Sequence, residues 1–324
     1  MIPQQTGARI VALGHYLPSR EVTNDELAQQ IDTTDEWIRT RVGISTRRVA
    51  EPDESVADMA VAAAAKALAR SGLDAAEVDL VTVATCTAME RMPNIASRVA
   101  RSLDIRGAAV FDTNVACSGF CYALATADHA VQCGSSRAAL VIGADKMSDF
   151  LDWQDRTTCV LFGDGAGAAV VAAGGTTPEP GIGPVVWGSE PDRGEAIRLE
   201  TSGPEGPRAL FRQDGQTVYR WTTTTLASVA RRACERAGVP PEELAGIVTH
   251  QANLRIIDRI VDRLGAHQAV VARDVVDSGN TSAASVPIAL SKLIEQGALP
   301  TGSPVLLLGF GAGLAYAAQV VRCP

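Results

Sequence analysis

Apolar runs of strand length alternate with helical segments along the whole chain. DLVTVATCT (79–87) and AGIVTHQAN (245–253) are strand-like, and each is followed by a helical pattern that carries arginines, at 95–105 and 255–266. This alternation predicts an α/β protein whose mixed sheets are covered by helices. The helix predicted over 58–71 has almost only alanine on its buried side, so we expect it to lie close between two sheets.

The chain contains an internal repeat. GDGAGAAVVA (163–172) and GFGAGLAYAA (309–318) match in register at their glycines and at most of their alanines. A helix end, a glycine and a short acidic segment also recur. These repeats predict two related α/β halves, 1–174 and 175–324.

The two halves differ by one extra stretch. Residues 146–160 (KMSDFLDWQDRTTCV) stand between the apolar run ALVIGAD and the first glycine motif. The matching run of the second half, VLLLGFGAG, has no such insert. Inserts on a regular scaffold often carry substrate contacts, so we expect this cap insert to help form a binding site.

Composition excludes several classes of partner. The 324 residues suffice for a large core, which must be aliphatic because 46% of residues are hydrophobic and only 4% aromatic. The formal net charge is -8 without a long basic run, so nucleic acid and anionic membranes are poor partners. No apolar stretch approaches about 18 residues and no signal peptide is visible, so we expect neither a membrane span nor secretion.

The cysteines favour a reducing compartment. Seven cysteines are scattered along the chain without a CxxC pair, which is typical of free thiols in the cytoplasm. Only four histidines are present, so a structural zinc site is not expected. The sequence therefore predicts a cytoplasmic protein that holds no metal.

One cysteine stands at a strand-to-helix junction. In DTNVACSGFCYALATADHAV (112–131), Cys117 lies where an apolar run meets a turn and then a helix. A thiol there feels the positive end of the helix dipole and free backbone N–H groups, which lower its pKa and can hold an oxyanion. This favours a nucleophile; the alternative is a packed core thiol. In the repeat, VACSG (115–119) falls opposite SGNTS (278–282), so Cys117 matches Asn280.

A histidine and an asparagine stand at comparable places. His250 ends the run LAGIVTH, and ligands of α/β proteins gather at such strand ends. There it can act as acid, base or hydrogen-bond donor, whereas His15, His129 and His267 are better interpreted as structural. Asn280 stands at a turn-to-helix entry, where the alternative is a plain N-cap. Together, Cys, His and Asn at three strand ends of one duplicated scaffold indicate a single site.

Two other interpretations fit the residues less well. Papain-like proteases also combine Cys, His and Asn, but not in a repeated α/β frame. A non-catalytic nucleotide-binding module could use GDGAG and GFGAG. These glycines precede strand-like runs rather than helices, so the dinucleotide-binding pattern fails.

The chain resembles a known family. Its motifs ACSGF, HQANLRIID, GNTSAASVPIAL, FGDGAGAAV and GFGAG are similar to those of β-ketoacyl-acyl-carrier-protein synthase III, of the thiolase superfamily. The resemblance extends from ARIVALGHYLP to the C-terminus. It implies the duplicated, five-layered α-β-α-β-α thiolase fold, which agrees with the repeat. It also implies a homodimer and no cofactor, with acyl-CoA as a substrate.

The resemblance implies a two-step reaction. Cys117 takes an acyl group from acyl-CoA, and malonyl-acyl carrier protein then replaces CoA. His250 and Asn280 hold the malonyl thioester carbonyl while decarboxylation builds negative charge on it, and the carbanion attacks the acyl thioester. Backbone N–H groups of Cys117 and Ala312 form a second oxyanion hole, and Phe310 flanks the malonyl carboxylate. The product starts a fatty acid or polyketide chain; the alternative is an acyltransferase of the same fold that acts without condensation.

Binding residues are implied in the same way. The segment 33–44 matches one in which a tryptophan stacks on adenine, and 214–220 matches a loop that contacts CoA. The implied CoA-binding residues are Thr33, Trp37, Arg41, Arg156, Gly215 and Asn253, with Arg156 on the second adenine face. Met92 stands where relatives often have an aromatic residue that shapes the acyl pocket across the dimer interface. Because methionine is flexible, longer or more branched starters than acetyl are expected.

Arginines recur on one face of a predicted helix. Three of them are spaced at i, i+4 and i+8 within 255–266. A basic stripe on an acidic protein can steer an acidic carrier protein. The implied docking residues are Arg220, Arg255, Arg259 and Arg263. The alternative is a solvated face that Asp258 and Asp262 neutralise.

Overall fold

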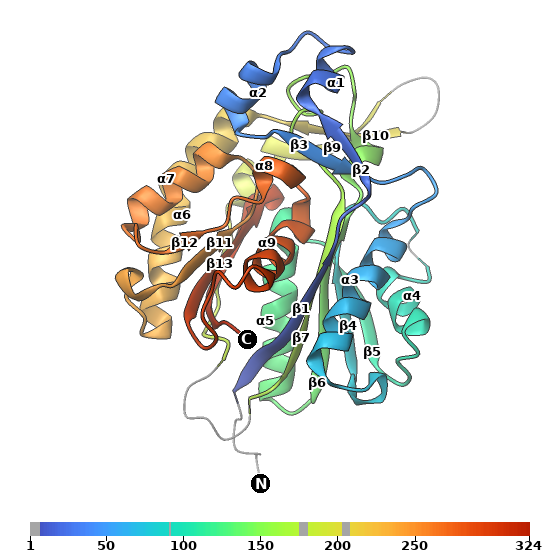
Figure 1. Ribbon diagram of the computed structural model, residues 1–324, viewed down its shortest axis with the longest axis vertical. Coiled ribbons are helices and arrows are strands. Elements are labelled where there is room, and N and C mark those ends of the chain that lie inside the picture. Colours follow the sequence, from blue (N-terminus) through green and yellow to red (C-terminus); the bar gives the residue numbers. More distant parts are fainter. Residues whose placement is uncertain (1–6, 91, 175–180, 203–207) are drawn as a thin grey trace.

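Two five-stranded sheets form the centre of the structure, a computed structural model that describes residues 7–90, 92–174, 181–202 and 208–324 (Figure 1). The first sheet has the strand order β1-β7-β6-β4-β5. In it β4 runs parallel to β5 and β6, while β7 runs antiparallel to β1 and β6. Its strands are β1 (Ala8–Tyr16), β4 (Leu80–Ala84), β5 (Ala109–Thr113), β6 (Ala138–Asp145) and β7 (Gly165–Ala173).

The second sheet repeats the order of the first. From its opposite edge it runs β8-β14-β13-β11-β12, so these strands take the places of β1, β7, β6, β4 and β5. Its strands are β8 (Val186–Ser189), β11 (Gly246–Thr249), β12 (Val270–Val271), β13 (Pro304–Gly311) and β14 (Ala315–Arg322). The boundary predicted between 174 and 175 adjoins residues 175–180, which lie outside the described residues.

Helices form three layers around these sheets (Figure 1). In the middle layer, α5 contacts β6 and β13, and α9 contacts β7 and β11. The outer layers are α3 with α4 on the first sheet and α6 with α7 on the second. The helices are α3 (Val56–Ser71), α4 (Ile95–Ser102), α5 (Gly119–Gln132), α6 (Gly215–Ala237), α7 (Leu254–Leu264) and α9 (Ser285–Glu295). The order of layers is α-β-α-β-α.

The alanine-rich helix does not lie where its composition suggested. We expected it between two sheets, but α3 covers the outer face of the first sheet. Most of its alanines are buried toward the sheet, while Asp58, Lys66 and Arg70 are exposed on the other side. Small side chains therefore bring α3 close to one sheet, and the polar face prevents burial against a second.

Shorter elements gather at one end of the molecule, at the top of Figure 1. They are β2 (Arg20–Thr23), α1 (Asn24–Ala28), α2 (Asp35–Val42), β3 (Thr46–Val49), β9 (Ile197–Ser202), β10 (Arg208–Gln213) and α8 (Val275–Ser278). Residues 146–164 separate β6 from β7, whereas only 312–314 separate β13 from β14. The first half thus carries the longer connection at the position of the predicted insert.

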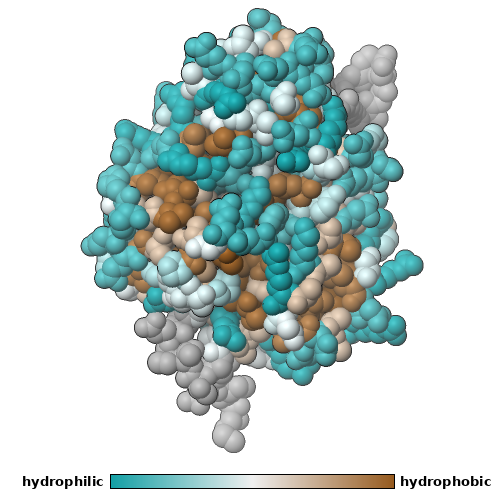
Figure 2. Space-filling view, viewed as in Figure 1, coloured by the Kyte–Doolittle hydropathy of each residue, from teal (hydrophilic) through white to brown (hydrophobic). Residues whose placement is uncertain are grey.

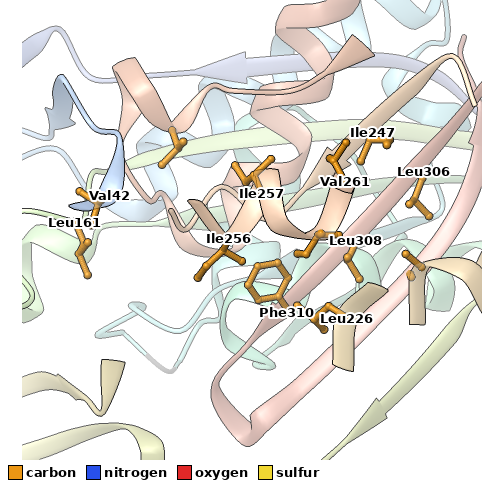
Figure 3. Close-up of a cluster of buried hydrophobic side chains, with 14 of the residues drawn as sticks. Val42, Leu161, Leu226, Ile247, Ile256, Ile257, Val261, Leu306, Leu308 and Phe310 are labelled. Atoms are coloured by element: carbon orange, nitrogen blue, oxygen red, sulfur yellow. The ribbon is translucent and has the colours of Figure 1, made fainter. Parts of the chain in front are cut away.

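The two faces of β13 serve different purposes because successive side chains alternate. Figure 3 shows one face, in a cluster formed where α6 and α7 pack on β11 and β13. The labelled members include Leu306, Leu308 and Phe310 on β13, Ile256, Ile257 and Val261 on α7, and Leu226 on α6. Gly309 and Gly311 lie on the opposite face of β13 and face the start of α5. Burial of one face therefore places the other against the central layer.

The visible surface is mixed in polarity. In Figure 2, hydrophobic areas on this face are separated by hydrophilic side chains. Within the described ranges, no helix is long and apolar enough to cross a membrane.

The topology corrects the register of the internal repeat. One offset relates the starts of four pairs of elements: Leu80 and Gly246, Ala116 and Ser282, Gly119 and Ser285, Ala138 and Pro304. Under this offset Cys117 corresponds to Ala283, and Asn280 corresponds to Asn114. The predicted match of Cys117 with Asn280 is therefore wrong by three residues, because the glycine of SGNTS precedes its turn whereas that of VACSG follows one.

The close approach of β6 to the start of α9 yields a prediction. A Cβ atom at Gly143 would lie 2.4 Å from the backbone oxygen of Ala283, which cannot move without shifting the whole turn. We expect Gly143→Ala to lower the free energy of unfolding by about 2 kcal/mol or more. Denaturant unfolding of both proteins measures the difference. Gly215→Ala is the control, since nothing lies within 4 Å of the added methyl group, and equal stability of the two variants would contradict the prediction.

Candidate active site

Cys117 sits in a tight turn between β5 and α5. The turn is the 3₁₀ segment Ala116–Ser118, and Ala116 has a φ of 43°, in the left-handed region that side chains disfavour. The side-chain oxygen of Asn114 accepts the Ala116 N–H at 3.2 Å and stabilises the turn. Cys117 is partly buried and precedes the first residue of α5 by two positions.

The end of β13 packs directly on this cysteine. A Cβ atom at Gly311 would lie 2.8 Å from Cys117 Cβ and 3.2 Å from its sulfur, so only glycine fits there. Ala312, the predicted oxyanion-hole residue, follows in a 3₁₀ turn that contacts the Cys117 turn. The Ser282 hydroxyl lies 3.5 Å from the Cys117 sulfur.

The pKa of Cys117 differs from the prediction. We expected the helix start to lower it, but burial raises the pKa of the thiol to about 12, with a smaller opposing effect from the Ser282 hydrogen bond and a further increase from the Asp145 carboxylate. Desolvation of the thiolate is the largest influence on this pKa. In the unliganded protein at neutral pH, Cys117 is a protonated thiol.

His250 follows β11 and is 2% exposed. Its backbone N–H donates to Leu308 O at 2.7 Å, and its ring nitrogen Nδ1 lies 2.7 Å from the Ser285 hydroxyl. The Phe310 ring meets the imidazole edge-on at 5.1 Å between centroids. Burial alone lowers the His250 pKa to about 3, so the imidazole is neutral at physiological pH.

Asn280 is held by its backbone and by one side-chain oxygen. Its N–H donates to Leu161 O at 2.8 Å, and its carbonyl accepts the Gly163 N–H at 3.1 Å. The side-chain Oδ1 accepts the Ser282 N–H at 2.9 Å, as Asn114 does in the other half. Within the described residues no hydrogen-bond partner of the side-chain Nδ2 is found, so this amide can donate to a ligand.

Sequence reasoning missed a buried carboxylate that connects the two halves. Asp145 accepts hydrogen bonds from the Thr85 and Thr87 hydroxyls, from the Cys86 N–H and from the Ala283 N–H, all between 2.8 and 3.0 Å. Four donors compensate for burial of the charge. The available signal was its position, because Asp145 ends the otherwise apolar run ALVIGAD.

Trp37 and Arg156 lie against each other. The Arg156 guanidinium is 5.1 Å from the centre of the Trp37 ring, and it donates to the Asp32 carbonyl at 2.7 Å. Trp37 lies in the first turn of α2, and the hydroxyl of the N-cap residue Thr34 accepts the Trp37 N–H. Beside them, the buried Thr33 hydroxyl oxygen has no partner among the described residues.

Several predicted binding residues line one surface cavity of about 560 Å³. The lining residues are Arg41, Gly215, Gln216, Tyr219, Arg220, Thr223 and Arg255. Asn253 caps α7 through the Arg255 N–H and donates weakly to the Arg41 carbonyl at 3.4 Å, which ties α7 to α2. The structure thus brings together Arg41 and Gly215, predicted for CoA, with Arg220 and Arg255, predicted for docking.

The other arginines of α7 have partners. Arg259 pairs with Asp262 at 3.7 Å. Arg263 donates to the carbonyl of Thr223 on α6. Asp258 pairs with Arg273 rather than within its own helix.

Met92 is 91% exposed in the single chain. The neighbouring Met89 is 71% exposed. Among the described residues, these two side chains are the most exposed of the large hydrophobic ones.

The fold and the site together define a class. A duplicated α-β-α-β-α fold that places a cysteine at the start of a central helix, with histidine and asparagine beside it, is that of a thiolase-fold condensing enzyme. The model of 3-oxoacyl-[acyl-carrier-protein] synthase III matches residues 111–191, and the model of its C-terminal region matches 234–323. The chain belongs to the 3-oxoacyl-[acyl-carrier-protein] synthase III family.

Similarities to individual proteins agree with this family assignment. The chain is 62% identical to β-ketoacyl-[acyl-carrier-protein] synthase III 4 of Streptomyces coelicolor, over 98% of this chain and 99% of the relative. The priming β-ketosynthase of the R1128 polyketide biosynthetic pathway is 45% identical, with a TM-score of 0.96 over 100% and 98% of the two chains. The synthase III of Aquifex aeolicus is 38% identical, with a TM-score of 0.90 over 98% and 100%. The predicted family, fold class and enzyme class are confirmed.

The depressed pKa of His250 predicts how stability depends on pH. The pKa is 6.5 for an ordinary histidine and about 3 in the folded protein. Below pH 6.5 the unfolded chain therefore binds a proton that the folded protein does not, and the free energy of unfolding falls as pH decreases toward 3. Relative to His250→Gln, we expect the native protein to lose about 1 kcal/mol more between pH 6.5 and about pH 5.5.

Denaturant unfolding of both proteins at the two pH values measures this loss. His267→Gln is the matched control, because His267 is exposed and lies outside the site. An identical loss in native protein and His250→Gln would show that His250 titrates normally in the folded state.

Proposed function

We propose that acyl-CoA acylates Cys117 and that malonyl-acyl carrier protein then condenses with the acyl group, which starts a fatty acid or polyketide chain. One observation carries this assignment of roles. Consecutive residues of β13 contact both sides of the site, since Phe310 meets His250 and Gly311 meets Cys117. Ser282 adds a second connection, through its hydroxyl to Cys117 and its N–H to Asn280. These contacts support the proposal that the nucleophile and both donors lie close enough for the acyl group on Cys117 to meet the malonyl thioester held by His250 and Asn280.

In the first step, the Cys117 sulfur attacks the thioester carbonyl of acyl-CoA. A new sulfur–carbon bond forms, the bond to the CoA sulfur breaks, and the thiol proton leaves with CoA as its free thiol. The N–H groups of Cys117 and Ala312 stabilise the oxyanion of this step. The high pKa of the resting thiol is no obstacle, because proton loss is coupled to attack and the oxyanion donors act on the developing charge.

In the second step, the carboxylate of the malonyl group leaves as CO₂. The electron pair of the broken carbon–carbon bond forms an enolate whose oxygen receives hydrogen bonds from His250 and Asn280. A neutral imidazole suits this role, since it donates without holding a charge that must be neutralised. The carbanion attacks the carbonyl carbon of the Cys117 thioester, a carbon–carbon bond forms, and the bond to sulfur breaks. The sulfur leaves as a thiolate, which takes a proton from solvent water. Phe310 desolvates the carboxylate and favours its loss.

CoA is proposed to bind along the cap elements. Adenine enters between Trp37 and Arg156. The guanidinium carbon lies 5.1 Å from the centre of the Trp37 ring, and this distance must increase to roughly 7 Å to admit a stacked base. The Thr33 hydroxyl supplies an unused polar group beside that slot. Arg41 and Gly215 line the cavity next to it, and Asn253 meets the pantetheine arm.

The carrier protein is proposed to dock over α6 and α7. Arg220 and Arg255 line the cavity there and present cations to an acidic partner. Arg259 is weakly paired, whereas Arg263 serves mainly to hold α7 on α6.

The proposed assembly is a homodimer in the cytoplasm. Met92 lies exposed on a loop of this chain, which suits a residue that completes the acyl pocket of a second copy. The proposed reaction uses no metal and no bound cofactor. With a net charge of -8, the protein has no affinity for nucleic acid or for anionic membranes in this proposal.

Acylation of Cys117 is the first test. Incubation with a panel of acyl-CoAs and intact-protein mass spectrometry should give a single acyl adduct on the native protein. Cys117→Ala should give none, and Cys133→Ala should keep the full adduct although it removes an exposed thiol. An adduct that persists in Cys117→Ala would refute the assignment, and the mass of the true adduct identifies the starter.

The adenine clamp gives a second test. We expect Arg156→Ala to raise the KM for acyl-CoA about tenfold, because a desolvated guanidinium on an aromatic face contributes about 1–2 kcal/mol. The KM for the corresponding acyl-pantetheine, which lacks adenine, should stay unchanged. Arg39→Ala is the control on the same cap, since Arg39 pairs with Asp35 and Ser45. An equal effect on both substrates would show that Arg156 does not contact the nucleotide.

A further inference from the structure

One buried hydroxyl contacts the catalytic histidine and has no role so far. Ser285 is the first residue of α9 and is fully buried, next to a histidine that is 2% exposed. Its Oγ lies 2.7 Å from His250 Nδ1. The same oxygen accepts the backbone N–H of Gln251 at 3.3 Å.

These two contacts determine where the ring proton lies. A hydroxyl has one proton and two lone pairs, and the Gln251 N–H occupies one of the lone pairs. If the ring carried its proton on Nδ1, that N–H would occupy the other, and the Ser285 proton would need a different acceptor. The described part of the chain offers none within hydrogen-bond distance of Ser285. The arrangement that satisfies every donor has Ser285 donating to Nδ1 and the ring proton on Nε2.

The Gln251 N–H is held firmly in place. Its own side chain donates to Thr249 O at 2.8 Å and to Ala272 O at 3.3 Å, and accepts the Val275 N–H at 3.1 Å. Gln251 is fully buried. The backbone N–H that occupies the Ser285 lone pair is therefore part of a rigid network and cannot rotate away.

We infer that Ser285 is a positioning residue that holds His250 as the Nε2–H tautomer. This inference rests on the proposed role of His250 as a donor to the enolate oxygen. Only a proton on Nε2 serves that role, because Nδ1 faces Ser285. Ser285 is then required for decarboxylation of the malonyl group and is dispensable for acylation of Cys117, which uses backbone donors.

A matched pair of serines on α9 tests this inference. Ser291 is also buried, and its hydroxyl lies 3.0 Å from Nδ1 of His15, outside the site. We expect Ser285→Ala to lower kcat for CO₂ release from malonyl-acyl carrier protein by about 10- to 100-fold with little change in KM. The single-turnover rate of Cys117 acylation should change less than twofold. Ser291→Ala should leave both rates unchanged, and Ser285→Thr, which keeps a hydroxyl, should recover part of the loss.

The tautomer itself is measured by nitrogen NMR of histidine-labelled protein. The His250 signals, assigned with His250→Gln, should show an unprotonated Nδ1 and a protonated Nε2 in the native protein. A mixture of tautomers is expected in Ser285→Ala. A protonated Nδ1 in the native protein would overturn the inference, and so would an unchanged rate of CO₂ release in Ser285→Ala. Equal losses in both half-reactions would reduce Ser285 to a structural role.

This design separates the inference from the function on which it rests. If the native protein released no CO₂ from malonyl-acyl carrier protein, the proposed function would fail. The tautomer measurement does not depend on any substrate and would still decide whether Ser285 controls the ring.

Discussion

The whole site depends on how closely the two halves approach at the ends of β6 and β13. Each of these strands carries a glycine that meets the turn of the opposite half: Gly143 meets Ala283, and Gly309 meets Ser118. A side chain at either place would separate a sheet from a central helix. Close packing of backbone on backbone is stiff, because neither partner can give way by a rotamer change. The positions of Cys117 and Asn280 are consequences of this contact.

Burial of the site determines the direction in which the pKa values of Cys117 and His250 are shifted. The Cys117 thiol and the His250 imidazole are both held neutral, the first by a raised pKa and the second by a lowered one. A thiolate–imidazolium pair is thus not the resting state. Four donors surround the nearby Asp145 carboxylate, and this carboxylate raises the pKa of Cys117 further. Chemistry in such a site relies on hydrogen-bond donors that stabilise charge only as it forms.

Much of this was predictable from the sequence, and the failures have physical causes. Strand ends and helix starts are local patterns, so Cys117, His250 and Asn280 could be proposed as site residues from the sequence, and the repeat predicted two similar sheets. The pKa of Cys117 could not be predicted, because it depends on burial in the folded protein and on a hydrogen bond with Ser282, which is far away in the chain. The predicted place of α3 was wrong, because an alanine-rich face indicates close packing but not the number of sheets against which the helix packs. Ser285 and Asp145 escaped notice because their roles depend on contacts between residues that are far apart in the chain.

The repeat explains why the site is asymmetric. Both halves have an asparagine whose side chain accepts the N–H of a residue with positive φ, Ala116 in one and Ser282 in the other. The frame is thus shared, and chemistry arises where equivalent positions differ. Cys117 stands opposite Ala283, so only one turn has a nucleophile, and Ser285 stands opposite Gly119, so only one helix start can orient a histidine. The last residues of β6 and β13 also differ. Asp145 ends β6 and accepts the Ala283 N–H, which anchors the turn after Asn280, whereas Gly311 ends β13 and leaves space for Cys117. In the proposed reaction, one half therefore supplies the attacking atom, and the other supplies the donors that receive the charge.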